Sequence, residues 1–389
     1  MLLKWWKNFG KGTKSTSIDT PYKFKKIIYF EQQEHIMKNF EPDYTNILNA
    51  AKRIKPKRMP LYEHIIDITI MEKILDKKFS SLYNGDAKDR KKFFKNYCNF
   101  FKEMGYDTVS FECLITSIMP GSGALYYHKP GVIKDRKDFN SYPWDDLPKL
   151  FFEKYSDDYK ILGEEMPPGM KAIGGPGNGI FECVQDIVGL SNLCMISADD
   201  PSLYRDLFNK MGEVFYKIWS AFLKNFSPTY AICRFGDDLG YKSSTILNPV
   251  DIKNMIIPQY KKIVGLVHYS HSKPFLLHSC GNIFSVMEDI INVAGIDAKH
   301  SNEDEIAPFP IWQKKYGDRI ALFGGVDMSF LCQASEDDIK EYASNILSYS
   351  INYPGFAFGT GNSVPDYMPV ENYLLMIKTA REFRCSNLS

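Results

Sequence analysis

The stretch Pro274-Phe275-Leu276-Leu277-His278-Ser279-Cys280-Gly281-Asn282 is a short apolar run that ends in a histidine and a cysteine. Side chains two residues apart in a strand point to the same side, so we expect His278 and Cys280 to project together from its carboxyl end. An imidazole and a thiol in that arrangement supply half of a tetrahedral zinc site. The pair also fits a hydrogen-bonded histidine beside a buried thiol. Which interpretation holds depends on what the other strands bring to the same place.

Similar runs recur along the chain, each an apolar strand with a polar or glycine-rich end, most of them followed by a helical segment. Eight such runs cover residues 58–63, 107–112, 171–176, 229–238, 273–280, 296–300, 319–325 and 355–361. Strands that alternate with helices predict a parallel sheet, and eight units predict a single (β/α)8 TIM barrel. A doubly wound open sheet is the alternative. Residues 114–171 are expected to form an elaborated loop after the second strand, near the mouth of the barrel.

Length and charge limit the classes of function. The 389 residues include 48 basic and 47 acidic side chains, so neither nucleic acid nor an anionic membrane surface is expected as the main partner. No apolar run reaches the roughly 20 residues of a membrane helix. Eight cysteines without paired spacing, in a chain without an export signal, favour reduced thiols and a cytoplasmic location. We assign residues 1–45 to an N-terminal extension and residues 46–389 to the barrel.

The carboxyl ends of the predicted strands carry polar side chains. In TIM barrels the catalytic groups come from these ends and from the loops that follow them. The pattern therefore favours an enzyme. The candidate residues around His278 and Cys280 are Glu63, Glu112, Asp237, Asp238, His300, Gly325 and Asn362.

Each candidate has a functional and a structural interpretation. Asp237 and Asp238 either provide a metal ligand, a general acid or base, or a substrate contact, or they cap the following helix. Glu63 is either functional or paired with a buried arginine or lysine. His300 is expected to donate to substrate or to orient a metal ligand.

The remaining candidates concern substrate binding. Glu112 ends the second predicted strand and is expected to contact substrate. The glycine-rich segments after the seventh and eighth strands contain Gly325 and Asn362. Such segments either bind phosphate through backbone N–H groups or form tight turns.

Five segments in this order make the chain resemble the uroporphyrinogen decarboxylase superfamily, and most closely its corrinoid-dependent methyltransferase branch. They are Gly236–Gly240, His278–Asn282, Asp297–Ser301, Asp318–Asp327 and Gly359–Tyr373. The resemblance is better from about residue 230 onward than between Arg53 and that point. It implies a single (β/α)8 barrel.

The sequence departs from the superfamily pattern at two places. Decarboxylases of tetrapyrrole acetates hold substrate carboxylates with an arginine-rich segment after the first strand, whereas residues 61–67 contain two acids and no arginine. We therefore do not expect uroporphyrinogen decarboxylation. Thiol methyltransferases of the superfamily bind zinc through His-x-Cys and a later cysteine, whose position falls near Asn362. No cysteine lies close to it, so an oxygen ligand such as Glu63 or Asp237 would complete the site.

The resemblance implies methyl transfer between a methyl-corrinoid such as protein-bound methylcobalamin and a small thiol, folate or methylated substrate, assisted by zinc. Zinc would be bound by His278 and Cys280. The catalytic residues would be Asp237, His300 and Glu63, and the substrate contacts Asp238, Glu112, Gly325 and Asn362. A corrinoid protein is the implied partner, and a homodimer is consistent with the resemblance. The alternatives are a carboxy-lyase that acts on a less acidic substrate and a corrinoid-binding module without catalysis.

Overall fold

Seven of the eight predicted strands form one parallel sheet in the computed structural model, which describes residues 40–127 and 129–386. Neighbours in the sheet follow the order of the chain. The strands are β1 (Thr108–Leu114), β2 (Lys171–Gly177), β3 (Tyr230–Gly236), β4 (Phe275–His278), β5 (Ala298–His300), β6 (Ala321–Val326) and β7 (Phe356–Thr360). Most of the predicted N-terminal extension, residues 1–39, lies outside the described residues, and its boundary stays a prediction.

The first predicted strand, residues 58–63, is not a regular strand. Leu61 forms a single parallel bridge with Phe358 of β7, where the N–H of Tyr62 donates to the Phe358 carbonyl at 2.9 Å. Pro60 has no N–H to give to a ladder, which limits pairing here. Within the described chain no bridge joins this segment to β1. The sheet is thus a curled parallel sheet of seven strands, and a closed eight-stranded barrel is not confirmed.

The buried side chain of Arg234 spans the space between residues 61–66 and β1. Its guanidinium donates to the Tyr62 hydroxyl at 2.9 Å and to the His64 carbonyl at 3.0 Å. It also forms an ion pair with Glu112 of β1, with 2.9 Å between Nη2 and Oε2. Side-chain contacts therefore connect the two segments where the backbone ladder is missing.

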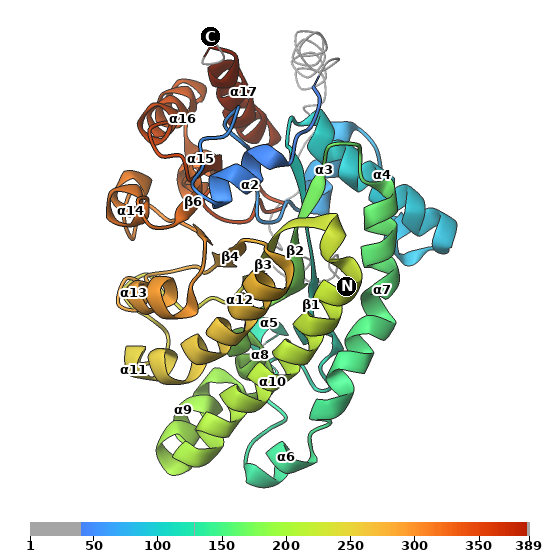
Figure 1. Ribbon diagram of the computed structural model, residues 1–389, viewed down its shortest axis with the longest axis vertical. Helices are drawn as coiled ribbons and strands as arrows, with labels where there is room; N and C mark the ends of the chain where they lie inside the picture. Colours follow the sequence, from blue (N-terminus) through green and yellow to red (C-terminus); the bar gives the residue numbers. More distant parts are fainter. Residues whose placement is uncertain (1–39, 128, 387–389) are drawn as a thin grey trace, which may run out of the picture.

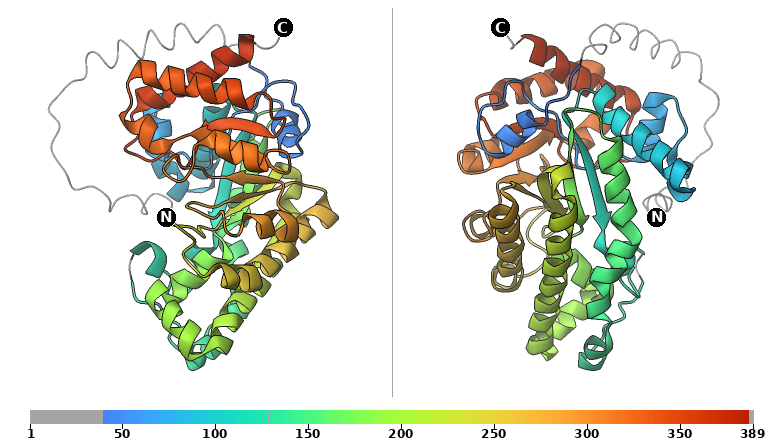
Figure 2. Two further views of the ribbon diagram at one scale, coloured as in Figure 1. Left: turned by 90° about the vertical axis from the view of Figure 1, so that its left-hand side faces the viewer. Right: turned by 45° about the vertical axis from the view of Figure 1, so that its right-hand side comes forward.

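Alternation along each strand divides the core into two parts. In β4, Leu276 packs inside the sheet, whereas Phe275 and Leu277 pack against the outer helices. The inner cluster is closed at the amino ends of the strands by α2 (Thr45–Ala51). Figures 1 and 2 show the other helices around the outer face of the curled sheet.

Most of the remaining helices form this outer layer. They are α3 (Ile68–Leu75), α4 (Ala87–Glu103), α7 (Leu147–Glu165), α8 (Ile180–Val188), α9 (Leu190–Asp199), α10 (Pro201–Phe226), α12 (Ile257–His271), α14 (Phe309–Tyr316), α15 (Met328–Gln333), α16 (Glu336–Ser350) and α17 (Val370–Ser386). Among the described residues no single helix is long and apolar enough to cross a membrane. The pair α8 and α9, bent by 93°, meets that criterion by length and composition only.

Short helical turns occupy the connections. They are η1 (Ser80–Asn84), η4 (Ser227–Thr229), α11 (Pro249–Asp251), α13 (Met287–Asp289) and the π-helical turns η5 (Ile252–Ile256) and η6 (Ile290–Ala294). The predicted excursion after β1 carries η2 (Ile115–Ile118), α5 (Ala124–Tyr127), α6 (Arg136–Ser141) and η3 (Trp144–Asp146). In Figure 1, α6 and α9 lie at one end of the molecule, and α16 and α17 lie at the other.

Arg234→Met is expected to lower the free energy of unfolding by about 3–5 kcal/mol, because it leaves the buried Glu112 without its cation. Urea unfolding followed by circular dichroism measures the change. The double variant Arg234→Met/Glu112→Gln is the matched comparison, since it leaves no unpaired buried charge. We expect it to regain much of the loss. A double variant as unstable as Arg234→Met would contradict this account.

Candidate functional site

A cavity of about 450 Å³ opens at the carboxyl end of the sheet. Parallel strands bring their loops together at this end, as expected for a TIM-barrel-like active site. The polar residues that line it come from segments far apart in the sequence. They include His64, Glu112, Asn178, Glu182, Asp238, His278, Cys280, Glu303, Asp327 and Asn362.

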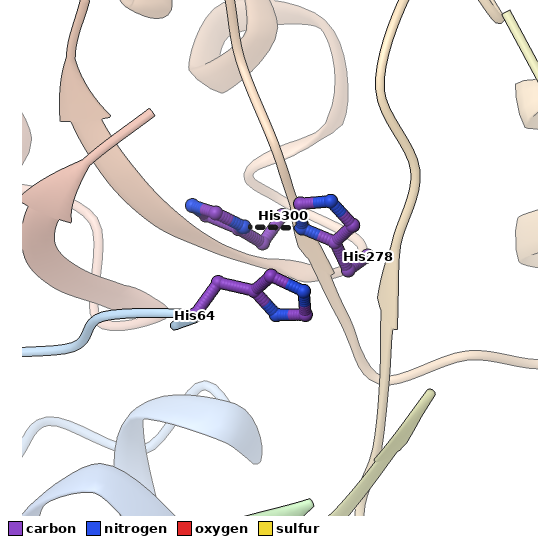
Figure 3. Close-up of side chains that lie close together, drawn as sticks. All are labelled: His64, His278 and His300. Atoms are coloured by element: carbon purple, nitrogen blue, oxygen red, sulfur yellow. Dashed lines mark hydrogen bonds between the residues drawn. The ribbon is translucent and has the colours of Figure 1, made fainter. Parts of the chain in front are cut away.

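The register between β4 and β5 places His278 beside His300. Their Nδ1 atoms are 2.7 Å apart, as the dashed line in Figure 3 marks. His300 Nε2 lies 2.9 Å from the Thr360 carbonyl, which can only accept a hydrogen bond. Nε2 of His300 therefore carries a proton, and Nδ1 of the neutral ring is an acceptor. His278 must then donate from its Nδ1, which leaves its Nε2 unprotonated and able to accept from the Cys280 thiol or to bind a metal.

Both imidazoles are held neutral. Burial lowers the pKa of His278 well below its ordinary value, with a further contribution from His300. Burial also lowers the pKa of His300 to about 3. The chain of hydrogen bonds that starts at Thr360 is the arrangement that orients metal-binding histidines in proteins.

The free Nε2 of His278 faces a sulfur and an oxygen. It lies 3.3 Å from Cys280 Sγ and 3.7 Å from Asp238 Oδ1. One donor atom from each of the three residues falls within 4.8 Å of the others. Nitrogen, sulfur and oxygen donors in this number fit zinc and leave a fourth position for a substrate. The Cys280 N–H donates to Asp238 Oδ1 at 2.9 Å and so positions the carboxylate.

Burial raises the pKa of the Cys280 thiol well above its ordinary value, and the charge of Asp238 raises it further. Burial also raises the pKa of Asp238. Two acidic groups that resist ionisation next to each other are expected where a cation belongs between them, because a divalent cation reverses both effects. The residues present therefore fit a bound metal ion.

His64 forms the wall beside this group. Its ring stacks on that of His278 with 3.7 Å between the centroids and 6° between the planes (Figure 3). Its Nδ1 is buried and has no hydrogen-bond partner among the described residues. His64, His278 and His300 also form a second group of possible metal donors. The Nδ1 atoms of His278 and His300 are already engaged with each other, so the group with Asp238 is the better candidate.

Asp237 does not line the cavity. Its carboxylate accepts hydrogen bonds from the backbone N–H groups of Phe181 at 3.0 Å and Glu182 at 2.9 Å, at the start of α8, and from the Tyr260 hydroxyl. A Cβ at Gly179 would lie 2.0 Å from the Asp237 side chain, so glycine makes this contact possible. Asp237 thus acts as a helix cap, but of α8, which precedes it in the chain, and not of the following helix named in the alternative. The catalytic role of Asp237 stays a prediction that these contacts do not favour.

Glu63 lies behind the histidines and does not line the cavity. Its carboxyl contacts the N–H of Thr360 at 3.3 Å, the Thr360 hydroxyl and the Tyr106 hydroxyl. Thr360 Oγ1 also lies 2.6 Å from the Asn362 carbonyl, and its one proton can serve only one of these two acceptors at a time. A proton on Glu63 would allow both contacts to be hydrogen bonds at once. Burial raises the pKa of Glu63 to about 8, in agreement with a neutral acid.

Three of the four predicted substrate contacts line the cavity: Asp238, Glu112 and Asn362. Asn362 donates from Nδ2 to Cys280 Sγ at 3.2 Å. Gly325 does not line the cavity, and its N–H donates to Asn302 Oδ1 at 3.1 Å.

Sequence reasoning gave no role to His64, Asn178 or Glu182, although all three line the cavity. Asn178 donates from Nδ2 to Glu182 Oε2 at 3.2 Å and to the Tyr126 hydroxyl at 2.7 Å. Burial raises the pKa of Glu182 well above its ordinary value, and the charges of Asp238 and Asp237 raise it further. The signal available in the sequence for Glu182 was its position three residues after Gly179, a possible helix cap.

A second cavity of about 500 Å³ adjoins the first, and both include Leu114 and Tyr126 in their walls. The excursion after β1 and helix α7 form most of it. Asp186 in its wall accepts two backbone hydrogen bonds through Oδ1, whereas its buried Oδ2 has no partner in the described chain. The two adjoining cavities at the carboxyl end of the sheet can therefore hold a ligand larger than the few atoms that would bind a metal.

The sequence model of uroporphyrinogen decarboxylase (URO-D) matches residues 45–383. The chain belongs to the uroporphyrinogen decarboxylase family. This confirms the resemblance to the superfamily, whereas the corrinoid-dependent methyltransferase branch stays a prediction. No curated protein sequence matches the chain significantly.

One solved structure has the same fold as this family member, and another has a lower score. A methyltransferase from Methanosarcina mazei has a TM-score of 0.70 and 17% sequence identity, over 88% of this chain and 99% of that chain. A putative vitamin-B12 independent methionine synthase from Listeria monocytogenes has a TM-score of 0.48 and 12% identity, over 84% of this chain and 99% of that one. At such identities the first likeness shows the fold alone.

Glu63→Gln is expected to gain stability relative to the unchanged protein as the pH rises from about 5 to about 8. The pKa of Glu63 is raised from 4.5 to about 8 by folding. Its contribution is therefore fully present below about 4.5 and is lost as the pH rises through about 8, whereas an amide does not titrate. Urea unfolding across this range measures the difference.

The control is Glu305→Gln, which changes an exposed acid and is expected to shift stability little at any pH. A difference between Glu63→Gln and the unchanged protein that stays constant with pH would show that Glu63 is ionised in the fold.

Proposed function

We propose that this chain is a methyltransferase that moves a methyl group between a corrinoid carried by a partner protein and a small thiol, folate or methylated substrate, with the help of zinc. The observation that carries the proposal is the donor group of Asp238, His278 and Cys280 with its free Nε2. The name of the Methanosarcina mazei neighbour is consistent with this chemistry.

Asp238, His278 and Cys280 would hold the metal. Zinc supplies a charge that lowers the pKa of a bound thiol from about 8.5 and so makes the thiolate available near neutral pH. In the direction of thiol methylation, the thiolate sulfur forms the new C–S bond while the Co–C bond breaks and its electron pair stays on cobalt. The thiol proton passes to solvent.

His300 acts as a positioning residue in this proposal. Its Nε2–H is fixed by the Thr360 carbonyl, so its Nδ1 keeps the proton of His278 on the side away from the metal. Asn362 and Ser301 stand 3.2 Å and 3.6 Å from Cys280 Sγ as hydrogen-bond donors. Donors at these positions stabilise a thiolate. Asp238 takes the place of the oxygen ligand that was expected from Glu63 or Asp237.

The partner would approach over the carboxyl ends of the strands. Tyr241, in the loop after β3, is 67% exposed, and Tyr367, in the wall of the cavity, is 72% exposed. Exposed aromatic rings at the rim of an open cavity are typical of surfaces that receive another protein. We place the corrinoid protein at this rim.

Metal analysis tests the donor group. Protein loaded with zinc and dialysed is expected to keep about one ion per chain, whereas Cys280→Ala is expected to lose it because only two donors remain. Cys194→Ala, which changes an exposed thiol, is the matched control. Asn362→Cys adds a thiolate next to Cys280 and is expected to bind zinc more tightly under reducing conditions. Absence of zinc from the well-folded unchanged protein would overturn the metal-based proposal.

Methyl transfer is tested by the absorbance change of methylcobalamin with candidate thiols and folates. The unchanged protein and Cys194→Ala are expected to demethylate it, and Cys280→Ala is expected to lose at least about a hundredfold in rate. Full activity of Cys280→Ala would remove the metal from the mechanism. Failure with every acceptor would favour the alternatives, a carboxy-lyase of this family or a corrinoid-binding module.

A further inference from the structure

Carboxylates dominate the wall of the cavity beside the metal-donor group. Among the described residues that line it are five acids and neither lysine nor arginine. The acids are Glu112, Glu182, Asp238, Glu303 and Asp327. The two lining histidines, His64 and His278, stack with 3.7 Å between their ring centroids, a distance at which positive charge on both rings is unfavourable. The described residues that line the cavity therefore present carboxyl groups and no lysine or arginine, and a cationic ligand would favour the ionised form of those carboxyl groups.

The nearest buried cations are engaged elsewhere. The guanidinium of Arg234 pairs with Glu112 and neutralises the charge of that one acid. Lys299 is adjacent to His300 in β5 and points to the other side of the strand, where its Nζ lies 4.3 Å from the centroid of the Trp312 ring. It also donates to the Ser301 carbonyl. Neither cation lines the cavity, although the charge of Lys299 acts on Asp238 and Glu303 from the other side of the strand.

A bound divalent ion would neutralise the charges of Asp238 and the Cys280 thiolate. The lining acids that then remain without a cation in the described wall are Glu182, Glu303 and Asp327. Asp327 caps α15 through the N–H of Phe330 at 2.8 Å, and Glu303 accepts from the Gly281 N–H at 3.4 Å. Glu182 accepts only from neutral donors among the printed contacts of the described chain, the Asn178 amide at 3.2 Å and the Gly179 N–H at 3.3 Å.

The corner around Glu182 offers further binding capacity. Tyr126 places its hydroxyl 2.7 Å from Asn178 Nδ2, and its ring belongs to the wall of the cavity. Asn178 also donates from Nδ2 to Glu182 Oε2 at 3.2 Å, so the Tyr126 hydroxyl and the Glu182 carboxyl share this amide as a neighbour. His64, only 4% exposed, keeps its Nδ1 without a partner in the described chain. Buried polar atoms without partners are rare unless a ligand or water completes them.

We propose that the cavity selects a small thiol whose far end is an ammonium group over neutral and anionic thiols of the same length. The proposal rests on the methyl transfer proposed above and names the class of its acceptor. The sulfur would lie at the open metal position, and the ammonium group would lie against Glu182 and the Tyr126 ring. An anionic end would meet carboxylates in a buried wall, where like charges repel strongly.

Three thiols with the same two-carbon chain test the selection: 2-aminoethanethiol, 2-mercaptoethanol and 2-mercaptoethanesulfonate. Binding is measured by calorimetry and by the thiolate-to-metal absorption of cobalt-loaded full-length protein. We expect the ammonium thiol to bind about tenfold more tightly than the neutral thiol, and the sulfonate to bind about tenfold more weakly than the neutral thiol.

Glu182→Gln is expected to reduce the preference for the ammonium thiol to about threefold or less, with little effect on 2-mercaptoethanol. Glu305→Gln removes an exposed acid outside the cavity and is expected to keep the tenfold preference. The ranking in the unchanged protein decides the proposal even if Glu182→Gln does not fold. Ligand-observed NMR with metal-free protein gives the same ranking without any metal.

The outcomes separate this proposal from the proposed function. Equal or tighter binding of the sulfonate would overturn the selection, even if methyl transfer to that thiol were observed. The expected ranking without methyl transfer to any acceptor would support the selectivity of the cavity and overturn the proposed activity. Absence of binding by all three thiols would overturn both.

Discussion

The buried ion pair between Arg234 and Glu112 connects the fold to the site. It bridges the segment that contains His64 to β1, at the place where the sheet has no backbone ladder. Removing two charges from water is costly, and such a pair persists where it fixes one arrangement. Here it fixes the position of His64 against the ring of His278. The side-chain link between this segment and β1 and the wall of the cavity therefore depend on the same guanidinium.

Arg234 also acts at a distance on the histidines. After desolvation, its positive charge is among the causes that lower the pKa of His64, His278 and His300. Neutral imidazoles are what the hydrogen bonds from Thr360 through His300 to His278 require, because a second proton on either ring would break the donor–acceptor order. A lone pair on His278 Nε2 is the result. The geometry and the electrostatics inside the curled sheet thus favour the same protonation state.

Much of this site could be predicted from the sequence, because the strand period of two and the carboxyl ends of strands are local properties. These two properties predicted the seven strands that form the sheet and the position of His278 beside Cys280. The register that sets His300 against His278 is a long-range property and could not be derived. The choice between Asp237 and Asp238 was also open, because the strand ends at Gly236 just before them. Room at Gly179 lets Asp237 cap α8, which leaves Asp238 to the cavity.

The position of the arginine also explains the charge of the cavity. Residues 61–67 contain no arginine, and the arginine that reaches the interior from β3 is used by Glu112, Tyr62 and the His64 carbonyl. A guanidinium that is already bonded to Glu112, Tyr62 and the His64 carbonyl cannot also neutralise a substrate carboxylate. Glu182 and Asp238 are then left facing the cavity without a cation from the described wall. Arg234 compensates for the missing ladder and does not line the cavity, which is consistent with the proposed preference of the site for a cationic ligand.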